Sequence, residues 1–506
     1  MTAPELTPQL DYPTLRRKSC NGETGMSRLS NSGNDLRVFM GELEDDGELR
    51  RVNGADWNLE IGALTEIGAE QNGPALLFDD IKGYPSGFRI LSNVFAGQKR
   101  TAMTLGLPRE LSGVALINAW RARLRDFRPV PPAKVKGGPV MDNIIEGDAV
   151  DLAAFPTPQW HEKDGGRYIG TGDAVITRDP DTGAVNIGTY RCMIQGKNRV
   201  SVKMNKGKHG RLAMQKYHAM GKPCPIAVSL GHAPQLFMAA QLPMPFGVEE
   251  YGVAGWLCDS PIEVVESPAS GLPLPAFGEI VLEGEVLPYK DGEPPREGPF
   301  GEWPGYYADT TVGEVPVMEV HRIYHRNDPI MLGAPPLKPP NNFISLPLGA
   351  AVLWDQLERA GIPEVKGVWG YIYGSQTGPF TVVAIRQAYA GHAKQALLVA
   401  SGARAGAYGG KFVVVVDDDI DITNLGDVIW AVSTRCNARE GIDLVKNVWT
   451  SPADPAIAPH ERSARGYTSD RVLIDACRPY RWMDEFPEVN CFPPDVKEEY
   501  RKKWGF

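Results

Sequence analysis

Short apolar runs separated by turn-forming residues fill the middle of the chain, from about residue 140 to residue 325. Runs of this kind, bounded by Gly, Pro, Asn, Asp or Ser, are typical of β-strands. The sequence contains 55 Gly and 43 Pro, which is high for a helical protein, and both residues favour turns. We therefore predict a mostly β barrel or sandwich here, with one helix near 210–221.

The residues on either side show other periodicities. Apolar residues recur at helical spacing over 36–43, between a predicted N-cap at Asp35 and a C-terminal glycine at Gly47. Further along this first part, a strand is predicted at 75–78 and a helix at about 109–125. After about residue 330, strand-like and helical segments alternate, which predicts a parallel α/β domain. The strand-like segments are 381–385 and 412–416, and the helical ones are 391–400 and 427–435.

These patterns together predict an α+β multidomain chain. Its length of 506 residues agrees with about three domains, and the proline-rich segment 128–133 is a natural linker. The predicted parts are an N-terminal arm 1–34, an N-terminal α+β domain 35–130, a central β domain 131–328, a C-terminal α/β domain 329–480 and a tail 481–506.

Composition excludes several classes of protein. The formal net charge of −9 argues against a nucleic-acid-binding protein. No apolar run approaches the roughly 18 residues that cross a bilayer, and the first residues lack the apolar core of a secretory signal. The seven cysteines are scattered and form no CxxC pair. This argues against a disulfide framework or a structural zinc site, so we expect a cytoplasmic protein.

Two carboxylates bracket a Gly-Pro-Phe-Gly segment, at Glu297 and Glu302. Two glycines and a proline in so short a segment predict a shaped loop, which can turn both acids into one cavity. Two acids in one cavity have separated pKa values, as an anchor and a proton donor require. The alternative is a solvated turn with two surface acids.

Two basic segments could complement these acids. Arg191 offers a planar guanidinium that matches a carboxylate, but taken by itself it is more often an ordinary strand-end arginine. His209, next to Lys208, suits a phosphate or metal near a helix start, and the alternative is a solvated basic turn. Asn186, His209 and Glu250 would together suit Mn²⁺ or Mg²⁺ rather than zinc, although no local spacing links them.

Taken in order, these segments resemble the UbiD family of decarboxylases, which use prenylated FMN. The resemblance covers about residues 35–480 and rests on EGPFGE at Glu297, NIGTYR at Asn186, EYGVAGWL after Glu249, and DDIDITNLGDVIWAVSTR from Asp418. The separations agree with those of the family, because His209 follows Arg191 by 18 residues and Glu250 follows His209 by 41.

The resemblance implies a role for each matching residue. Arg191, Glu297 and Glu302 match the catalytic network, and Asn186, His209 and Glu250 match the ligands of a Mn²⁺ (or Mg²⁺) ion at the cofactor phosphate. The implied cofactor-contacting residues are Asn186, Ile187, Gly188, Thr189, Tyr190, Arg191, Lys208, His209, Glu250 and, less directly, Arg386. An implied K⁺ site uses carbonyls near Ile187, Ala240 and Leu242 together with Glu250. The implied substrate pocket contains Thr171, and the sequence adds Lys203, Asn205 and Trp303.

The implied fold is an N-terminal α+β domain, a split β-barrel that binds flavin, and a C-terminal α/β domain that forms dimers or hexamers. The implied reaction is reversible, non-oxidative decarboxylation through a covalent adduct with prenylated FMN, in which Arg191 orients the substrate, Glu297 holds Arg191 and Glu302 delivers a proton. A flavin prenyltransferase would supply the cofactor. Polar pocket residues favour an aromatic or heteroaromatic acid of the indole, pyrrole, phenazine or hydroxybenzoate type.

Two other functions remain open at this point. A metal-dependent hydrolase could use Glu297 and Glu302 as an acid/base pair, and it would bind no chromophore. A non-catalytic flavin-binding protein would be coloured and release no CO₂.

Overall fold

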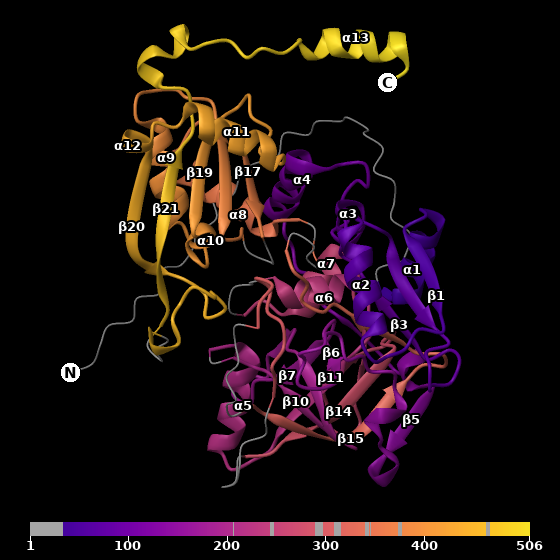
Figure 1. Ribbon diagram of the computed structural model, residues 1–506. Coiled ribbons are helices and arrows are strands. Elements are labelled where there is room, and N and C mark those ends of the chain that lie inside the picture. The colour runs from indigo at the N-terminus through magenta and orange to yellow at the C-terminus, as the bar shows by residue number, and fades with distance from the viewer. Residues whose placement is uncertain are drawn as a thin grey trace, which may run out of the picture. The chain divides into compact units, whose positions relative to one another are not determined.

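The computed structural model describes residues 34–205, 207–242, 247–288, 297–307, 315–339, 344, 346–372, 377–461 and 466–506. These residues form a mixed α/β fold with several sheets (Figure 1). The predicted N-terminal arm lies outside the described residues except for Asn34. Among the described residues, no helix is both long and apolar enough to span a bilayer.

The first part of the chain builds a four-stranded sheet with the order β1-β2-β3-β16. Its elements are α1 (Leu36–Asp45), β1 (Leu49–Asn53), α2 (Glu60–Glu70), β2 (Ala75–Asp79), β3 (Arg89–Ser92), α3 (Gln98–Thr104), α4 (Gly113–Arg125) and β16 (Ile330–Gly333). The predicted helix after Asp35 is confirmed, since the Asp35 side chain accepts a hydrogen bond from the Arg37 N–H at 2.8 Å and Gly47 has φ +69°. The strand predicted at 75–78 is also confirmed.

One strand of this sheet corrects the predicted organisation. The sequence places the residues after 329 in the C-terminal domain, but β16 pairs in parallel with β3. The chain therefore returns to the first sheet before it enters the C-terminal part. No local pattern identifies this return, because a short buried strand gives the same apolar run in any sheet.

The central part is a nine-stranded sheet, and each of its strand pairs is antiparallel. Its main path is β6-β9-β10-β15-β14-β11-β7-β8, and β5 pairs with β15. The strands are β5 (Asn143–Glu146), β6 (Tyr168–Gly170), β7 (Ala174–Arg178), β8 (Val185–Gly188), β9 (Cys192–Gly196), β10 (Arg199–Val202), β11 (Cys224–Ser229), β14 (Ile280–Val286) and β15 (Val317–His325). A three-stranded sheet accompanies it, built from β4 (Ala133–Val135), β12 (Glu263–Glu266) and β13 (Pro273–Pro275).

Three helices, rather than the one that we predict, interrupt the described residues of this β region: α5 (His209–Ala219), α6 (Pro234–Gln241) and α7 (Glu250–Leu257). The first confirms the helix predicted near 210–221. The other two lack an amphipathic period because they are surrounded by protein: every residue of α7 is buried, as is 234–239 of α6. A helix that is apolar on all sides cannot be recognised from periodicity.

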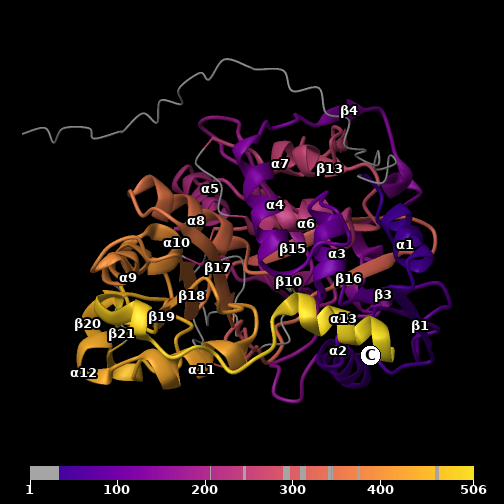
Figure 2. The ribbon, with the colours of Figure 1, turned by 90° about the horizontal axis from the view of Figure 1, so that it is seen from above.

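The C-terminal part contains a five-stranded sheet of order β17-β18-β19-β21-β20. Its elements are α8 (Leu348–Arg359), β17 (Val365–Tyr371), β18 (Phe380–Ile385), α9 (His392–Gly402), α10 (Arg404–Ala407), β19 (Phe412–Asp417), α11 (Leu425–Arg435), α12 (Ala438–Gly441), β20 (Ile442–Trp449) and β21 (Thr468–Asp475). The predicted strands and helices are confirmed, but the sheet is mixed: β18, β19 and β21 run parallel, and β17 and β20 pair antiparallel at the edges. Figure 2 shows α8, α9 and α10 along one face of this sheet and α11 along the other. The last helix is α13 (Pro494–Trp504).

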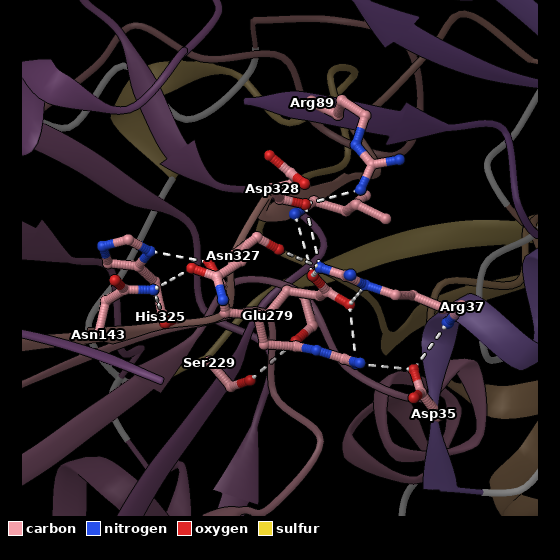
Figure 3. A network of polar contacts seen from close by, with 12 residues as sticks. Asp35, Arg37, Arg89, Asn143, Ser229, Glu279, His325, Asn327 and Asp328 are labelled. Atoms are coloured by element: carbon pink, nitrogen blue, oxygen red, sulfur yellow. Dashed lines mark hydrogen bonds and ion pairs between the residues drawn. The ribbon is translucent and has the colours of Figure 1, made fainter. Parts of the chain in front are cut away.

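A buried acid, Glu279, joins the first sheet to the central one (Figure 3). Its carboxylate accepts hydrogen bonds from Arg37 Nε and Nη2 at 2.9 and 2.8 Å and lies 3.2 Å from Arg326 Nη1. Arg326 also donates to Asp35 at 2.9 Å. The start of α1 is thereby tied to the segment between β15 and β16.

Candidate active site

Arg191 lies between two carboxylates that come from a distant part of the chain. Its Nε and Nη2 donate to the two oxygens of Glu297 at 2.8 and 2.9 Å, and its Nη1 donates to Glu302 at 2.6 Å. Arg191 stands in the short connection from β8 to β9, and both acids stand on the loop 297–307. The bidentate contact fixes the plane of the guanidinium group.

Glu297 is committed to holding Arg191. Its side chain is fully buried, and Oε1 also accepts a hydrogen bond from the Tyr168 hydroxyl at 2.8 Å. Lys203 Nζ lies 4.0 Å from Oε2. Burial, with the charge of Glu297, raises the pKa of the Tyr168 phenol, which therefore stays protonated and donates. Burial lowers the pKa of Arg191, but Glu297 and Glu302 outweigh it and raise the pKa overall.

Glu302 has a different environment. Its side chain is 23% exposed and lines a cavity of about 200 Å³, together with Arg191, Lys203 and Asn205. The Glu297 carboxylate thus holds the guanidinium group on the buried side. The Glu302 carboxylate lines the cavity next to Arg191. This difference matches an anchor on one side and a proton-exchanging group on the other.

The shape of the loop depends on glycine and proline. Gly298 has φ +92°, which favours glycine, and the Gly298–Pro299 peptide is cis. The Gly165 N–H donates to the Pro299 carbonyl at 2.7 Å, and a Cβ on Gly165 would lie 2.0 Å from the Gly298 oxygen. The Phe300 ring packs against Tyr168, with ring centroids 3.9 Å apart. The loop is therefore seated against 165–168, and both acids reach Arg191.

A second cavity, of about 250 Å³, is lined by Asn186, His209 and Glu250. Asn186 belongs to β8, while His209 and Glu250 are the first residues of α5 and α7. Glu250 Oε2 accepts the Ile187 N–H at 2.8 Å, and burial raises the pKa of Glu250 to about 7. Helix N-termini favour anions, and Asn, His and Glu supply the oxygen and nitrogen donors that suit Mn²⁺ or Mg²⁺.

The Asn186 side chain faces the Tyr190 hydroxyl and lowers the pKa of that phenol, but among the described residues its buried Nδ2 makes no hydrogen bond of standard geometry. A phosphate oxygen is an acceptor that would satisfy it. Among the described residues, no three His, Cys, Asp or Glu side chains converge on a metal-sized site. A metal here therefore depends on the amide of Asn186. These donors fit a cation next to a phosphate.

The segment from Gly188 to Arg191 connects the two cavities. A Cβ on Gly188 would lie 2.6 Å from the Tyr190 hydroxyl, so the Tyr190 ring can fold over this position only because it is glycine. Burial raises the pKa of Tyr190 to about 12. The buried Thr189 Oγ1 has no partner among the described residues. A cofactor with a phosphate at one end and a flat ring at the other fits this arrangement.

Comparison with known proteins agrees with this geometry. Three family models match the chain, namely the N-terminal, Rift-related and C-terminal domains of 3-octaprenyl-4-hydroxybenzoate carboxy-lyase, at residues 40–120, 133–339 and 343–476. Pyrrole-2-carboxylic acid decarboxylase from Pseudomonas aeruginosa is 30% identical over 500 residues, which cover 94% of this chain and 99% of the relative. The chain belongs to the UbiD family.

Solved structures of a vanillic acid decarboxylase and of a UbiD-class enzyme have the same fold. Vanillic acid decarboxylase from Sedimentibacter hydroxybenzoicus, in open form, has a TM-score of 0.79 and 31% identity, covering 93% of this chain and 98% of that one. The UbiD-class enzyme HmfF from Pelotomaculum thermopropionicum, in complex with FMN, has a TM-score of 0.79 and 31% identity, covering 91% and 98%. An evolved dimeric form of HmfF in complex with prFMN has a TM-score of 0.75 and 29% identity, covering 92% and 98%.

The structure places most of the residues expected from UbiD motifs around the two cavities. Thr171, Lys203, Asn205 and Lys208 line the first, and Thr171 Oγ1 accepts the Ala334 N–H at 3.0 Å. Sequence reasoning missed Gln241, which also lines this cavity. It ends the apolar helix α6, and no local motif singles it out.

Two residues expected near the site lie elsewhere. Arg386 follows β18, is paired with Asp418 at 2.8 Å with a side chain 65% exposed, and lines neither cavity. Trp303 lines a third cavity, of about 260 Å³, together with Phe380 and Phe412 of the C-terminal sheet. The turn after Glu302 points the indole away from the cavity that Glu302 faces. This placement separates Trp303 from Lys203 and Asn205, with which the sequence analysis groups it.

The described contacts do not test the K⁺ prediction. Ile187 is bonded to Glu250 through its N–H, while Ala240 and Leu242 stand at the end of α6 and line neither of the two cavities. Their carbonyl oxygens therefore stay a prediction from the UbiD resemblance.

Proposed function

We propose that this chain catalyses the reversible, non-oxidative decarboxylation of an aromatic or heteroaromatic carboxylic acid with the aid of prenylated FMN. The observation that carries the proposal is the Arg191 guanidinium, fixed by Glu297 and offered with Glu302 to one cavity. Support comes from membership of a carboxy-lyase family and from the activities for which its relatives are named.

Loss of CO₂ from an unsaturated carbon leaves an electron pair that no side chain can accept, and prenylated FMN supplies this electron sink when bound. Arg191 binds the substrate carboxylate and directs it towards the cofactor position. Glu297 keeps Arg191 from turning away. Once CO₂ has left, protonated Glu302 gives its proton to the carbon and recovers one from solvent through its exposed side. In the reverse direction, ionised Glu302 removes that proton.

The second cavity would hold the phosphate end of the cofactor. Asn186, His209 and Glu250 would bind Mn²⁺ or Mg²⁺, and carbonyls near Ile187, Ala240 and Leu242 would bind K⁺ with Glu250. The central sheet would then be the flavin-binding half-barrel, and the C-terminal sheet would assemble dimers or hexamers. We propose a cytoplasmic enzyme supplied by a flavin prenyltransferase.

The cavity beside Arg191 narrows the choice of substrate. Lys203, Asn205 and Thr171 give its wall a cation, an amide and a hydroxyl group. Such a wall offers hydrogen-bonding groups to a ring substituent or ring heteroatom, which a hydrocarbon chain lacks. Pyrrole-type and hydroxybenzoate-type acids, as in two relatives, meet this condition, and indole- and phenazine-type acids have a ring nitrogen that would do so.

Co-expression with a flavin prenyltransferase tests the proposal. We expect a coloured protein that releases CO₂ from at least one acid of a heteroaromatic and hydroxybenzoate panel. Glu302→Gln should stay folded and flavin-loaded but lose at least about 10²-fold in turnover. Glu319→Gln, which changes a half-buried acid on β15, is the matched control and should retain activity. A colourless hydrolase, a coloured protein without CO₂ release, or an active Glu302→Gln variant would contradict the proposal.

A further inference from the structure

Asp173 is a fully buried acid close in sequence to the wall of the candidate active site. It stands between β6 and β7, two residues after Thr171, which lines the cavity beside Arg191. Its Oδ1 has no hydrogen-bond partner among the described residues. A buried carboxyl group with an unsatisfied oxygen lowers the stability of the folded state, so its position next to a functional arginine calls for a reason.

The carboxyl group contacts the residues on both sides of Arg191. The Cys192 thiol lies 3.6 Å from Asp173 Oδ2 and 3.2 Å from the Tyr190 carbonyl oxygen. The Tyr190 backbone N–H faces the same carboxyl group and lowers its pKa, although burial raises it more. Asp173 therefore lies against the residue before Arg191 and the residue after it, while the Arg191 side chain extends to Glu297 and Glu302.

The backbone at Arg191 is not part of a strand, so contacts outside the strand pairing must fix its position. Residues 189–191 lie between β8 and β9, outside the ladder of the sheet. The Arg191 carbonyl accepts the Lys203 N–H at 3.1 Å. That hydrogen bond fixes the backbone of Arg191 against Lys203. Asp173 contacts the residues that precede and follow Arg191.

The close packing of β6 against β9 keeps this contact in place. Gly170 is paired with Cys192, and a Cβ on Gly170 would lie 2.8 Å from Cys192 Cβ and 3.2 Å from Asp173 Cγ. Both distances are too short for a side chain without movement of the pair. Glycine at 170 therefore allows the carboxyl group and the thiol to meet.

We propose that Asp173 is a positioning residue for Arg191. By contacting Tyr190 and Cys192, it fixes the backbone at residue 191 so that the guanidinium group points towards the substrate carboxylate. This inference rests on the proposed function, because it assumes that Arg191 binds that carboxylate. Loss of a group that orients a functional side chain typically costs about 10–100-fold in activity or affinity.

Substitutions at Asp173 test the inference in the flavin-loaded enzyme. With pyrrole-2-carboxylate and vanillate as probes, we expect Asp173→Ala to lower kcat/KM by about 10–100-fold, mainly through KM. Asp173→Asn keeps an oxygen that accepts the Tyr190 N–H, so it should restore most of the activity. Wild-type kcat/KM in a folded, flavin-loaded Asp173→Ala variant would overturn the inference.

A double-mutant cycle separates this role from general damage. If Asp173 acts through Arg191, adding Asp173→Ala to Arg191→Ala should cause no further loss of binding of the two acids, measured by calorimetry. Additive losses would overturn the inference and leave the proposed function standing. Unchanged binding of both acids by Arg191→Ala alone would instead contradict the proposed function.

A glycine pair tests the same contact if Asp173→Ala does not fold. Gly170→Ala pushes on Cys192 and Asp173 without removing either, and it should raise KM in the same way. Gly196→Ala, at the other end of β9, is the matched control because a Cβ there meets nothing within 4 Å among the described residues. Equal KM values for the two variants would count against the inference.

Discussion

At the scale of single residues, two glutamates five positions apart have different surroundings. Glu297 is enclosed by Arg191, Tyr168 and Lys203, whereas Glu302 meets Arg191 at one oxygen and faces a cavity. The enclosed acid can only hold its neighbours, and the open one can exchange a proton. The sequence predicts the pair, but the assignment of each role comes from the family resemblance.

This difference predicts different kinetics for the two amide variants. Glu297→Gln leaves Arg191 with a weaker support and should mainly raise KM for the acid substrate. Glu302→Gln removes the proton donor and should mainly lower kcat, by about 10²–10⁴-fold. Steady-state CO₂ release measures both parameters, and an equal change of kcat in the two variants would contradict the assignment.

Asp173 predicts a pH dependence of stability. Burial raises its pKa to about 7, above the value of about 3.9 in an unfolded chain. The folded protein thus holds a proton that the unfolded chain has lost, and stability should fall by about 1.4 kcal/mol for each pH unit between these values, then level off above pH 7.

Asp173→Asn cannot ionise and should lack this contribution. Urea unfolding at pH 5 and pH 8 compares the two proteins, and the loss of stability between these pH values should be smaller in the variant. Parallel losses in wild type and variant would show that Asp173 does not titrate in this range.

At the scale of elements, the C-terminal part contains an arginine that is bonded to carbonyls. The fully buried Arg471 of β21 donates to the carbonyls of Gly410 and Ala407 at 2.9 and 2.6 Å, and also to Ser401. Ser401 and Ala407 stand at the ends of α9 and α10, where helix carbonyls lack partners and favour a cation. Arg471 therefore joins two helix C-termini to the sheet.

We expect Arg471→Met to lower the free energy of unfolding by about 3 kcal/mol, because several buried carbonyls lose charged donors. Arg481→Met removes an exposed pair with Glu440 and should change stability by less than about 1 kcal/mol. Chemical denaturation measures both variants. Equal effects would contradict the capping role of Arg471.

The turn after Glu302 makes a second prediction at this scale. The Glu302 N–H donates to the Tyr306 carbonyl at 2.9 Å, which closes the turn and directs Trp303 to the third cavity. Asn205→Leu, in the wall of the first cavity, should therefore raise KM more than Trp303→Ala does. A larger increase of KM in Trp303→Ala than in Asn205→Leu, measured with the same acid, would show that Trp303 contacts the substrate.

At the scale of the whole molecule, sequence patterns predict the type of secondary structure in each part of the chain better than they predict which strands pair. The α1 cap, the β-rich centre and the strand–helix alternation of the C-terminal part all leave local signals. The return of β16 to the first sheet and the edge position of β17 and β20 do not, because pairing partners depend on distant segments. The sequence does not predict α6 and α7 for a related reason. Because they are buried on nearly all sides, their apolar residues show no helical period.

The site follows the same rule. Arg191, Glu297 and Glu302 stand in compact motifs, so a family resemblance assigns them from the amino-acid sequence alone. Tyr168, Gln241 and Asp173 are brought to the site by the fold: Tyr168 hydrogen-bonds Glu297, Gln241 lines the first cavity and Asp173 contacts Cys192. No spacing in the chain singles them out.

The destination of one proton tests the central claim most directly. The flavin-loaded enzyme should convert its acid in D₂O to a product with one deuterium, located by NMR at the carbon that lost CO₂. Glu302→Gln should form little of this product. Product without deuterium at that carbon, or full deuterated product from Glu302→Gln, would contradict the role of Glu302 and with it the account of Arg191 between two unequal acids.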